Sequence, residues 1–185
     1  MIGGKNSTAG PNSPIFANQG DVYQQVLHLK SETINPYNLK KVIEFLENEL
    51  QEDIPSNQLI QDDEDLKRIN IVNKNYINNL EQEGSTDYFD IIIESSIYFK
   101  SIKDVLSNPR NNKLRKSYNN IKKTINNKIP DIKRRKEYFS EVLNEIIDRF
   151  FNSNDETIME NEELVSVIVH FMYFICHVGD NDAKT

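Results

Sequence analysis

The segment Leu164-Val-Ser-Val-Ile-Val-His-Phe-Met-Tyr-Phe-Ile-Cys-His-Val178 decides the fold class, because it is a long and almost wholly apolar stretch. A helix built from it is apolar on every side and has to be buried among other helices. It is too short for a membrane span, which takes about 20 apolar residues. Glu162 and Glu163 suit the first turn of such a helix, and Gly179 suits its end. We therefore predict a core helix over residues 162–178.

Apolar residues recur at helical spacing through most of the chain before this segment. Asn35 followed by Pro36 is typical of a helix start. Breaks are indicated at Pro55, Gly84, Asn108-Pro109 and Pro130. With the core helix, the predicted helices span residues 36–52, 63–82, 86–107, 112–129, 134–151 and 162–178. Residues 22–29 would add a seventh helix, although their spacing also fits a strand. The expected fold is an all-α, compact bundle of six to seven helices.

The first 20 residues differ from the rest in composition. They hold four of the six glycines and two of the six prolines of the chain, with Asn, Ser and Thr between them. Such a leader buries too little apolar surface to fold alone. Its apolar residues Pro14, Ile15 and Phe16 are candidate partner-binding residues, which would order against another chain by strand addition. The alternative is a passive tail. We expect a leader over residues 1–20 and a single helical domain over residues 21–185.

Composition excludes several classes of protein. One cysteine cannot form an internal disulfide, so the 185-residue chain is not a secreted disulfide scaffold. The N-terminus lacks the charged and apolar regions of a signal peptide, and no apolar run spans a membrane. We therefore expect a cytoplasmic protein. Three histidines and six glycines offer little material for an active site.

Charge is distributed unevenly along the chain. Residues 110–136 contain eleven Lys and Arg and a single acid, Asp131, which gives a charge of +10 within a total of −7. The rest of the chain therefore carries −17. Such a split favours self-association or docking on an oppositely charged partner. The candidate partner-binding residues of this segment are Arg115, Lys116, Lys122, Lys123, Arg134 and Arg135. An acidic protein partner, a nucleic acid and a merely solvated helix face are the alternatives.

The sequence contains no recognisable catalytic or metal-binding pattern. A zinc site needs about four ligands at recurring spacing, whereas the last helix offers His170, Cys176 and His177 alone. We expect a buried Cys176 and histidines close to the helix C-terminus, where protonation is favoured. No Gly-rich phosphate loop follows a strand, and no serine or cysteine is marked as a nucleophile with its base. We predict no catalytic, cofactor-binding or metal-binding residues and no cofactor.

The closing segment Ile168-Val-His-Phe-Met-Tyr-Phe-Ile-Cys-His-Val-Gly-Asp-Asn181 resembles the end of helical domains in bacterial ABC-three-component conflict systems. The matching positions are Phe171, Met172, Tyr173, Cys176, Gly179 and Asp180, whereas His177 stands where that family would have an acid. The stretch Leu66-Lys-Arg-Ile-Asn-Ile-Val-Asn-Lys-Asn-Tyr-Ile-Asn-Asn79 is similar in character to the family's charged, Asn-rich helix. The leader through Val22 also looks like the leaders of conflict-system domains.

This resemblance implies an all-helical, non-catalytic module that couples an effector to a partner such as an ATPase. We therefore expect an adaptor or sensor subunit of a bacterial antiviral complex, with protein partners and possible self-association. A nucleic-acid-binding regulator that uses residues 110–136 is one alternative. A small toxic effector enzyme is the other.

Overall fold

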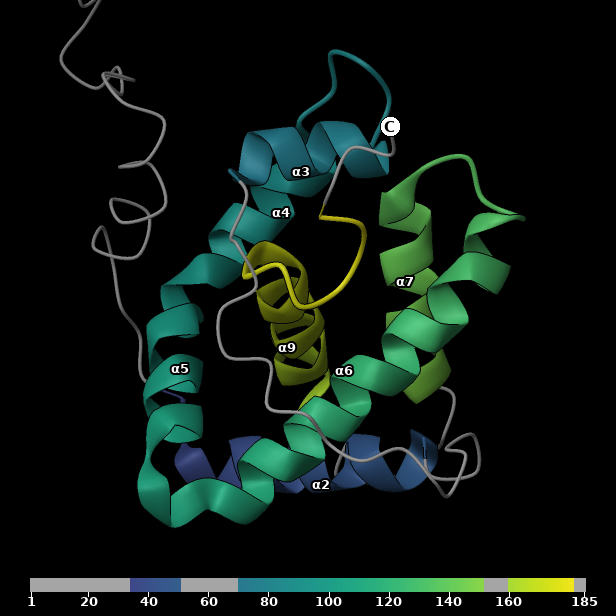
Figure 1. Ribbon diagram of the computed structural model, residues 1–185. Helices are drawn as coiled ribbons and strands as arrows, with labels where there is room; N and C mark the ends of the chain where they lie inside the picture. Colours follow the sequence, from purple (N-terminus) through teal and green to yellow (C-terminus); the bar gives the residue numbers. More distant parts are fainter. Residues whose placement is uncertain (1–33, 51–69, 152–159, 182–185) are drawn as a thin grey trace, which may run out of the picture.

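The computed structural model describes residues 34–50, 70–151 and 160–181, and the described part of the chain is all-α, as predicted (Figure 1). The α-helices are α2 (Pro36–Leu50), α3 (Ile71–Asn78), α4 (Asp87–Ser95), α5 (Phe99–Ser107), α6 (Asn112–Lys133), α7 (Phe139–Phe151) and α9 (Glu162–Phe174). Two short 3₁₀ turns, η2 (Ser96–Tyr98) and η3 (Pro109–Asn111), precede α5 and α6. The expected leader and the helix over residues 22–29 lie outside the described residues.

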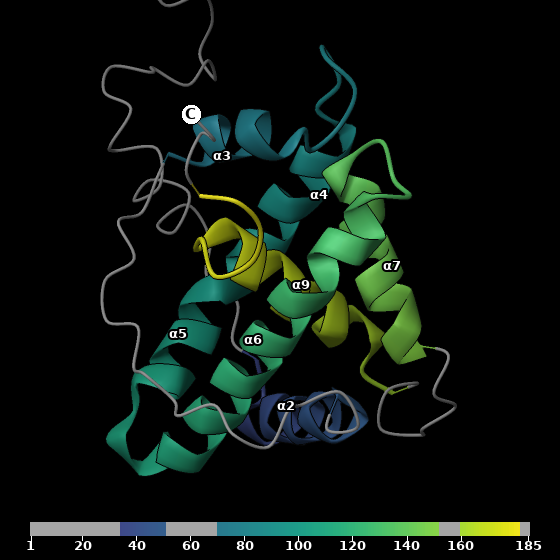
Figure 2. The same cartoon turned by 45° about the vertical axis from the view of Figure 1, so that its right-hand side comes forward.

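Helix α9 is the core helix, as its composition predicts. It runs through the middle of the bundle in both views (Figures 1 and 2), and α4 and α7 pack on it. All residues from 167 to 174 are buried. Phe99 of α5 contacts the rings of both Phe171 and Phe174, at centroid distances of 5.4 and 5.3 Å. Burial of a helix on all sides is the arrangement that an all-round apolar sequence requires.

Helix α2 forms the base of the bundle and packs along α6. Its apolar residues Leu39, Val42, Ile43, Leu46 and Leu50 are buried. Their spacing of three and four residues places them on one side of the helix. None of the described helices has the length and hydropathy needed to cross a membrane.

The predicted helix over residues 86–107 is interrupted by η2. The Ser95 hydroxyl donates to the carbonyl of Ile91 at 3.1 Å, and the Ser96 hydroxyl donates to the carbonyl of Ile93. Serine side chains that bond the carbonyls of the preceding turn compete with the helical ladder and bend the helix. The interruption therefore follows from two adjacent serines rather than from a glycine or proline.

Pro130 was expected to end the helix over residues 112–129, and that expectation is wrong. Helix α6 continues through Pro130 to Lys133. A proline there removes one backbone hydrogen bond, but the added turn buries Ile132, which is 1% exposed. Burial of an isoleucine side chain is worth about 1.5–3 kcal/mol, which offsets most of the cost of the lost bond.

Three other predicted boundaries differ from the structure. Helix α3 ends at Asn78, before Gly84 is reached, and is capped by Asn79, whose backbone is left-handed (φ 54°). Helix α9 ends at Phe174. Two residues after it, Cys176 (φ 65°) and Gly179, have a left-handed backbone. Helix α7 begins at Phe139, five residues later than predicted. The amides of Phe139 and Ser140 donate to the carbonyls of Asn79 and Leu80, which fixes the end of α3 against the start of α7.

Candidate protein-interaction surface

The outward side of α6 carries a row of lysine and asparagine side chains. Lys116, Asn119, Lys123 and Asn127 follow one another at spacings of three and four residues, which aligns them along one side of the helix; we call these four residues the α6 crest. None of them is buried, and the opposite side of α6 faces the core. Lys116 and Lys123 are seven residues apart, or about 10.5 Å along the axis.

Neither lysine of the α6 crest forms an ion pair with a described residue, whereas several of their basic neighbours do. Arg134 pairs with Asp131 at 3.1 Å, and Arg135 pairs with Glu145 at 3.0 Å. Arg149 also bonds Glu145, and these two arginines hold the pKa of Glu145 below its usual range. The predicted residues Arg134 and Arg135 are therefore paired with acidic side chains of the same chain.

Lys122 is not a surface residue, contrary to its selection as a candidate. It is 7% exposed. Tyr118 and Ile125 lie four residues before it and three residues after it, on the buried side of α6. Lys122 and Lys123 belong to the same basic run in the sequence. Successive side chains on a helix point in directions about 100° apart, so one of the two lysines faces the core and the other does not. Arg115, also a candidate, is exposed and donates to Asn112 one turn earlier.

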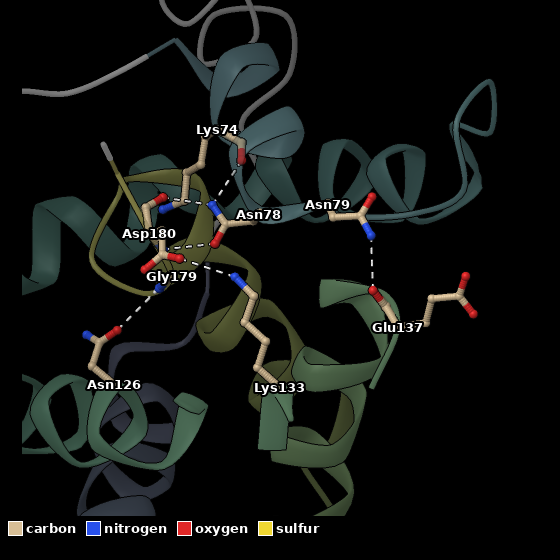
Figure 3. A network of polar contacts seen from close by, with 8 residues as sticks. All are labelled: Lys74, Asn78, Asn79, Asn126, Lys133, Glu137, Gly179 and Asp180. Carbon is tan, nitrogen blue, oxygen red and sulfur yellow. Dashed lines mark hydrogen bonds and ion pairs between the residues drawn. The ribbon is translucent and has the colours of Figure 1, made fainter. Parts of the chain in front are cut away.

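A network of polar contacts holds the segment after α9 against α3 and α6 (Figure 3). We call residues 175–181, which follow α9, the C-terminal hook. Lys74 of α3 has a completely buried side chain, and its ammonium group donates to the carbonyl of Val178 at 2.7 Å. The same nitrogen lies 4.6 Å from the centre of the Tyr173 ring, a cation–π distance. Burial lowers the pKa of Lys74 to about 8, and the nearby Asp180 opposes part of this shift.

Two asparagines complete the attachment of the hook. Asn78 donates to the carbonyl of Asp180 at 2.7 Å and accepts from the Asp180 amide at 2.8 Å. Asn126 of α6 donates to the carbonyl of His177 at 2.7 Å and accepts from the Gly179 amide at 3.2 Å. Each amide side chain thus replaces the backbone partners that the hook has lost on leaving the helix.

An ion pair and a ring reinforce the hook from α6 and α7. Lys133 pairs with the Asp180 carboxylate at 3.2 Å (Figure 3). The Tyr118 hydroxyl lies 3.0 Å from a ring nitrogen of His177. At Gly179, a Cβ atom would lie 2.9 Å from the Asn78 side-chain oxygen and 3.1 Å from the Phe139 ring. The Gly-Asp turn is therefore a packing requirement of this network.

Ser95, His170, Tyr88 and Asn144 form a second polar cluster, which links α4, α9 and α7. The Ser95 hydroxyl lies 2.9 Å from Nδ1 of His170, and the Tyr88 hydroxyl lies 3.3 Å from Nε2. The Tyr88 hydroxyl also donates to the side-chain oxygen of Asn144 at 3.0 Å. The cluster therefore links three helices.

The expectation that the histidines of the last helix favour protonation is wrong for His170. Its ring is buried, and burial lowers the pKa of His170 to about 4. The helix dipole, which favours protonation only in the last turn, does not offset this effect of burial on the pKa of His170. Cys176 is buried, as expected. Within the described ranges, no three His, Cys, Asp or Glu side chains gather as a metal site would require.

The polar residues that organise the fold were missed by the sequence interpretation. Val72 and Tyr76 of α3 are 61% and 88% exposed. The inward side of α3 is formed by Ile71, Lys74 and Asn78 instead. Their spacing of three and four residues was a possible signal, but it places a lysine and an amide in the core. The candidate residues Pro14, Ile15 and Phe16 lie outside the described residues.

Comparison with known proteins identifies the family of the chain. Searches of curated proteins and of solved structures gave no match. A family model, C-terminal domain 12 of the ABC-three component (ABC-3C) systems, matches residues 28–179. The match covers every helix that the structure describes, from α2 to α9, and ends within the hook. It confirms the resemblance carried by the closing segment. The chain therefore belongs to the family of C-terminal domain 12 of the ABC-3C conflict systems.

Proposed function

We propose that the chain is a non-catalytic adaptor or sensor subunit of an ABC-3C antiviral complex, which couples an effector to a partner such as an ATPase. ABC-3C systems have several protein components, and the family match makes this chain one of their domains. The α6 crest is the surface that we assign to partner binding. We expect the protein to act in the bacterial cytoplasm, without a cofactor.

The observation that carries this proposal is the unneutralised charge of Lys116 and Lys123. Both side chains project from a helix of 22 residues that packs on α2 and α7. Neither finds a carboxylate among the described residues, although the chain as a whole is acidic. An exposed and a half-buried lysine on one helix side offer an acidic protein two cations at a set spacing, which favours fast and specific encounter.

A protein partner fits the α6 crest better than a nucleic acid does. The crest alternates lysine with asparagine, and its outward side carries no aromatic residue on which a base could stack. Tyr118, the one tyrosine of α6, is 2% exposed and contacts Phe171 and His177.

The test is recovery of the complex from cells that express the whole system with a tagged form of this chain. Mass spectrometry of the captured material identifies the partners. Lys116→Glu with Lys123→Glu should reduce their recovery at least tenfold, and the wild-type complex should weaken as salt rises. Lys100→Glu with Lys103→Glu on α5 is the matched control, because it changes the charge by the same amount on another helix. The control variant should recover the partners normally.

Two results would contradict the proposal. Equal recovery with wild type and with the α6 variant would show that the crest is only a solvated helix face. Capture of DNA or RNA in place of proteins, lost in the α6 variant, would instead indicate a nucleic-acid-binding regulator. Circular dichroism of each purified variant verifies that the helices are retained.

A further inference from the structure

Helix α4 carries an acidic stripe on its exposed side. Asp87, Asp90 and Glu94 lie at positions i, i+3 and i+7, and together with Ile91 they form what we call the α4 crest. All four residues are exposed. The Asp90 carboxylate accepts a bond from the Thr86 hydroxyl at 3.2 Å, and none of the three acids pairs with a cation among the described residues.

The α4 crest and the α6 crest match in spacing and are opposite in sign. Asp87 and Glu94 are seven residues apart on α4, as Lys116 and Lys123 are on α6. Both pairs are therefore separated by about 10.5 Å along their helix axes. When two such helices lie side by side, each carboxylate can face an ammonium group, and two ion pairs form at once.

The two crests do not satisfy each other within one molecule. Helix α9, on which α4 packs, lies between α4 and α6 in both Figures 1 and 2. No ion pair joins the two crests. The opposite charges are thus available to different molecules.

An apolar side chain stands inside the α4 crest. Ile91 is 47% exposed and lies between Asp90 and Glu94 along the helix surface. Lysine side chains present their methylene stems to such a group while the ammonium reaches a carboxylate. Ile91 would thus contact the stems of Lys116 and Lys123 when the two ion pairs form, which adds apolar contact to the charge pairing.

We infer that the α6 crest of one copy binds the α4 crest of a second copy of this chain. This inference rests on the proposed function, because it names the partner of the same α6 surface. The contact joins two different surfaces, so each copy uses both crests, and the assembly grows head to tail into a ring or a short chain. Exposed ion pairs contribute little individually, so the association is weak and sensitive to salt.

The experiment is a charge swap followed by analytical ultracentrifugation of the full chain. Wild-type protein should associate as its concentration rises, and salt should reverse this. Lys116→Glu with Lys123→Glu should weaken self-association at least tenfold, as should Asp87→Lys with Glu94→Lys. An equimolar mixture of these two variants should associate again, because the acidic α6 of one fits the basic α4 of the other. Lys100→Glu with Lys103→Glu should associate like wild type.

Failure of the swap would overturn the inference. A mixture that stays monomeric while wild type associates would mean that other surfaces hold the copies together. A wild-type chain that is monomeric at all concentrations and at low salt would also refute it. Asp87→Asn with Glu94→Gln, which conserves side-chain shape, keeps the test decisive if the lysine variant of α4 does not fold; the neutral variant should still weaken association.

The proposed function has a separate outcome in these experiments. Loss of the system's other proteins from the α6 variant, combined with a monomeric wild type, would support the adaptor function and refute self-association. Self-association that follows the charge swap, combined with unchanged recovery of those proteins, would support self-association and refute the binding of other proteins by the α6 crest.

Discussion

The ammonium group of Lys74 donates a hydrogen bond of 2.7 Å to the backbone oxygen of Val178, which lies 104 residues further along the chain. This bond joins the short helix α3 to the hook that follows the core helix. Asn78 adds two hydrogen bonds to the backbone of Asp180. These polar contacts attach α3 to the hook, whereas Val72 and Tyr76 of the same helix are exposed. The stability of the hook should therefore respond to pH and to single polar substitutions.

The buried Lys74 predicts that the protein becomes more stable in mildly alkaline solution. Its pKa in the folded state is about 8, below the 10.5 of an exposed lysine. Between these values the unfolded chain binds more protons than the folded chain, so stability rises with pH. The free energy of unfolding should rise by about 2 kcal/mol from pH 7 to pH 9.5. Urea denaturation at several pH values measures it, and Lys74→Met should remove most of the rise.

The buried His170 predicts a loss of stability in mild acid. Burial lowers its folded-state pKa to about 4, whereas an exposed histidine titrates near 6.5. The stability that comes from the neutral ring is present above pH 6.5 and is lost as pH falls toward 4. From pH 7.5 to pH 5 the free energy of unfolding should fall by about 2 kcal/mol. His170→Gln should flatten this dependence; an unchanged slope in the variant would contradict the assignment.

Asn78 should contribute more to stability than its neighbours on α3. Its side chain is buried and bonds both the amide and the carbonyl of Asp180. Asn78→Ala leaves these groups without partners and should lower the free energy of unfolding by about 2–3 kcal/mol. The exposed Asn73 on the same helix is the matched control. Asn73→Ala should stay within about 0.5 kcal/mol of wild type in the same thermal or urea titration.

Two glycines with left-handed backbones offer a comparison between strain alone and strain with a clash. Gly84 (φ +85°) has open space where a Cβ would lie, so Gly84→Ala should cost about 1 kcal/mol. Gly179 (φ +87°) would place that atom 2.9 Å from Asn78 and 3.1 Å from Phe139. Gly179→Ala should therefore cost at least about 2 kcal/mol. Equal effects of the two substitutions on the melting temperature would show that the hook accommodates the added Cβ atom without a further loss of stability.

The Lys133–Asp180 pair should matter little by comparison. Each side chain of the pair is 38% exposed, so water screens it. Asp180→Asn removes the charge but leaves the backbone bonds of residue 180 to Asn78 in place. The expected loss is below about 1 kcal/mol and should vanish in high salt. A larger and salt-independent loss would mean that this carboxylate has a further role in the hook.

Periodicity within single segments was enough to predict the fold class and most of the helices. Leu39, Val42, Ile43 and Leu46 determine the inward side of α2 through local spacing alone. The apolar segment from Leu164 likewise identified the central helix, and its final residues carried the family resemblance. Such features could be predicted because helix formation depends on neighbours within one or two turns.

The tertiary structure alone decided which polar residues are buried. Lys74 and Asn78 are inside because Val178 and Asp180, about one hundred residues later, supply their partners. Lys122 is buried and Lys123 is not, although both belong to one basic run. Burial of a polar group is favourable only where hydrogen-bond partners converge on it. That convergence is a property of the packed helices, and the spacing within α3 or α6 does not show which distant groups supply the partners.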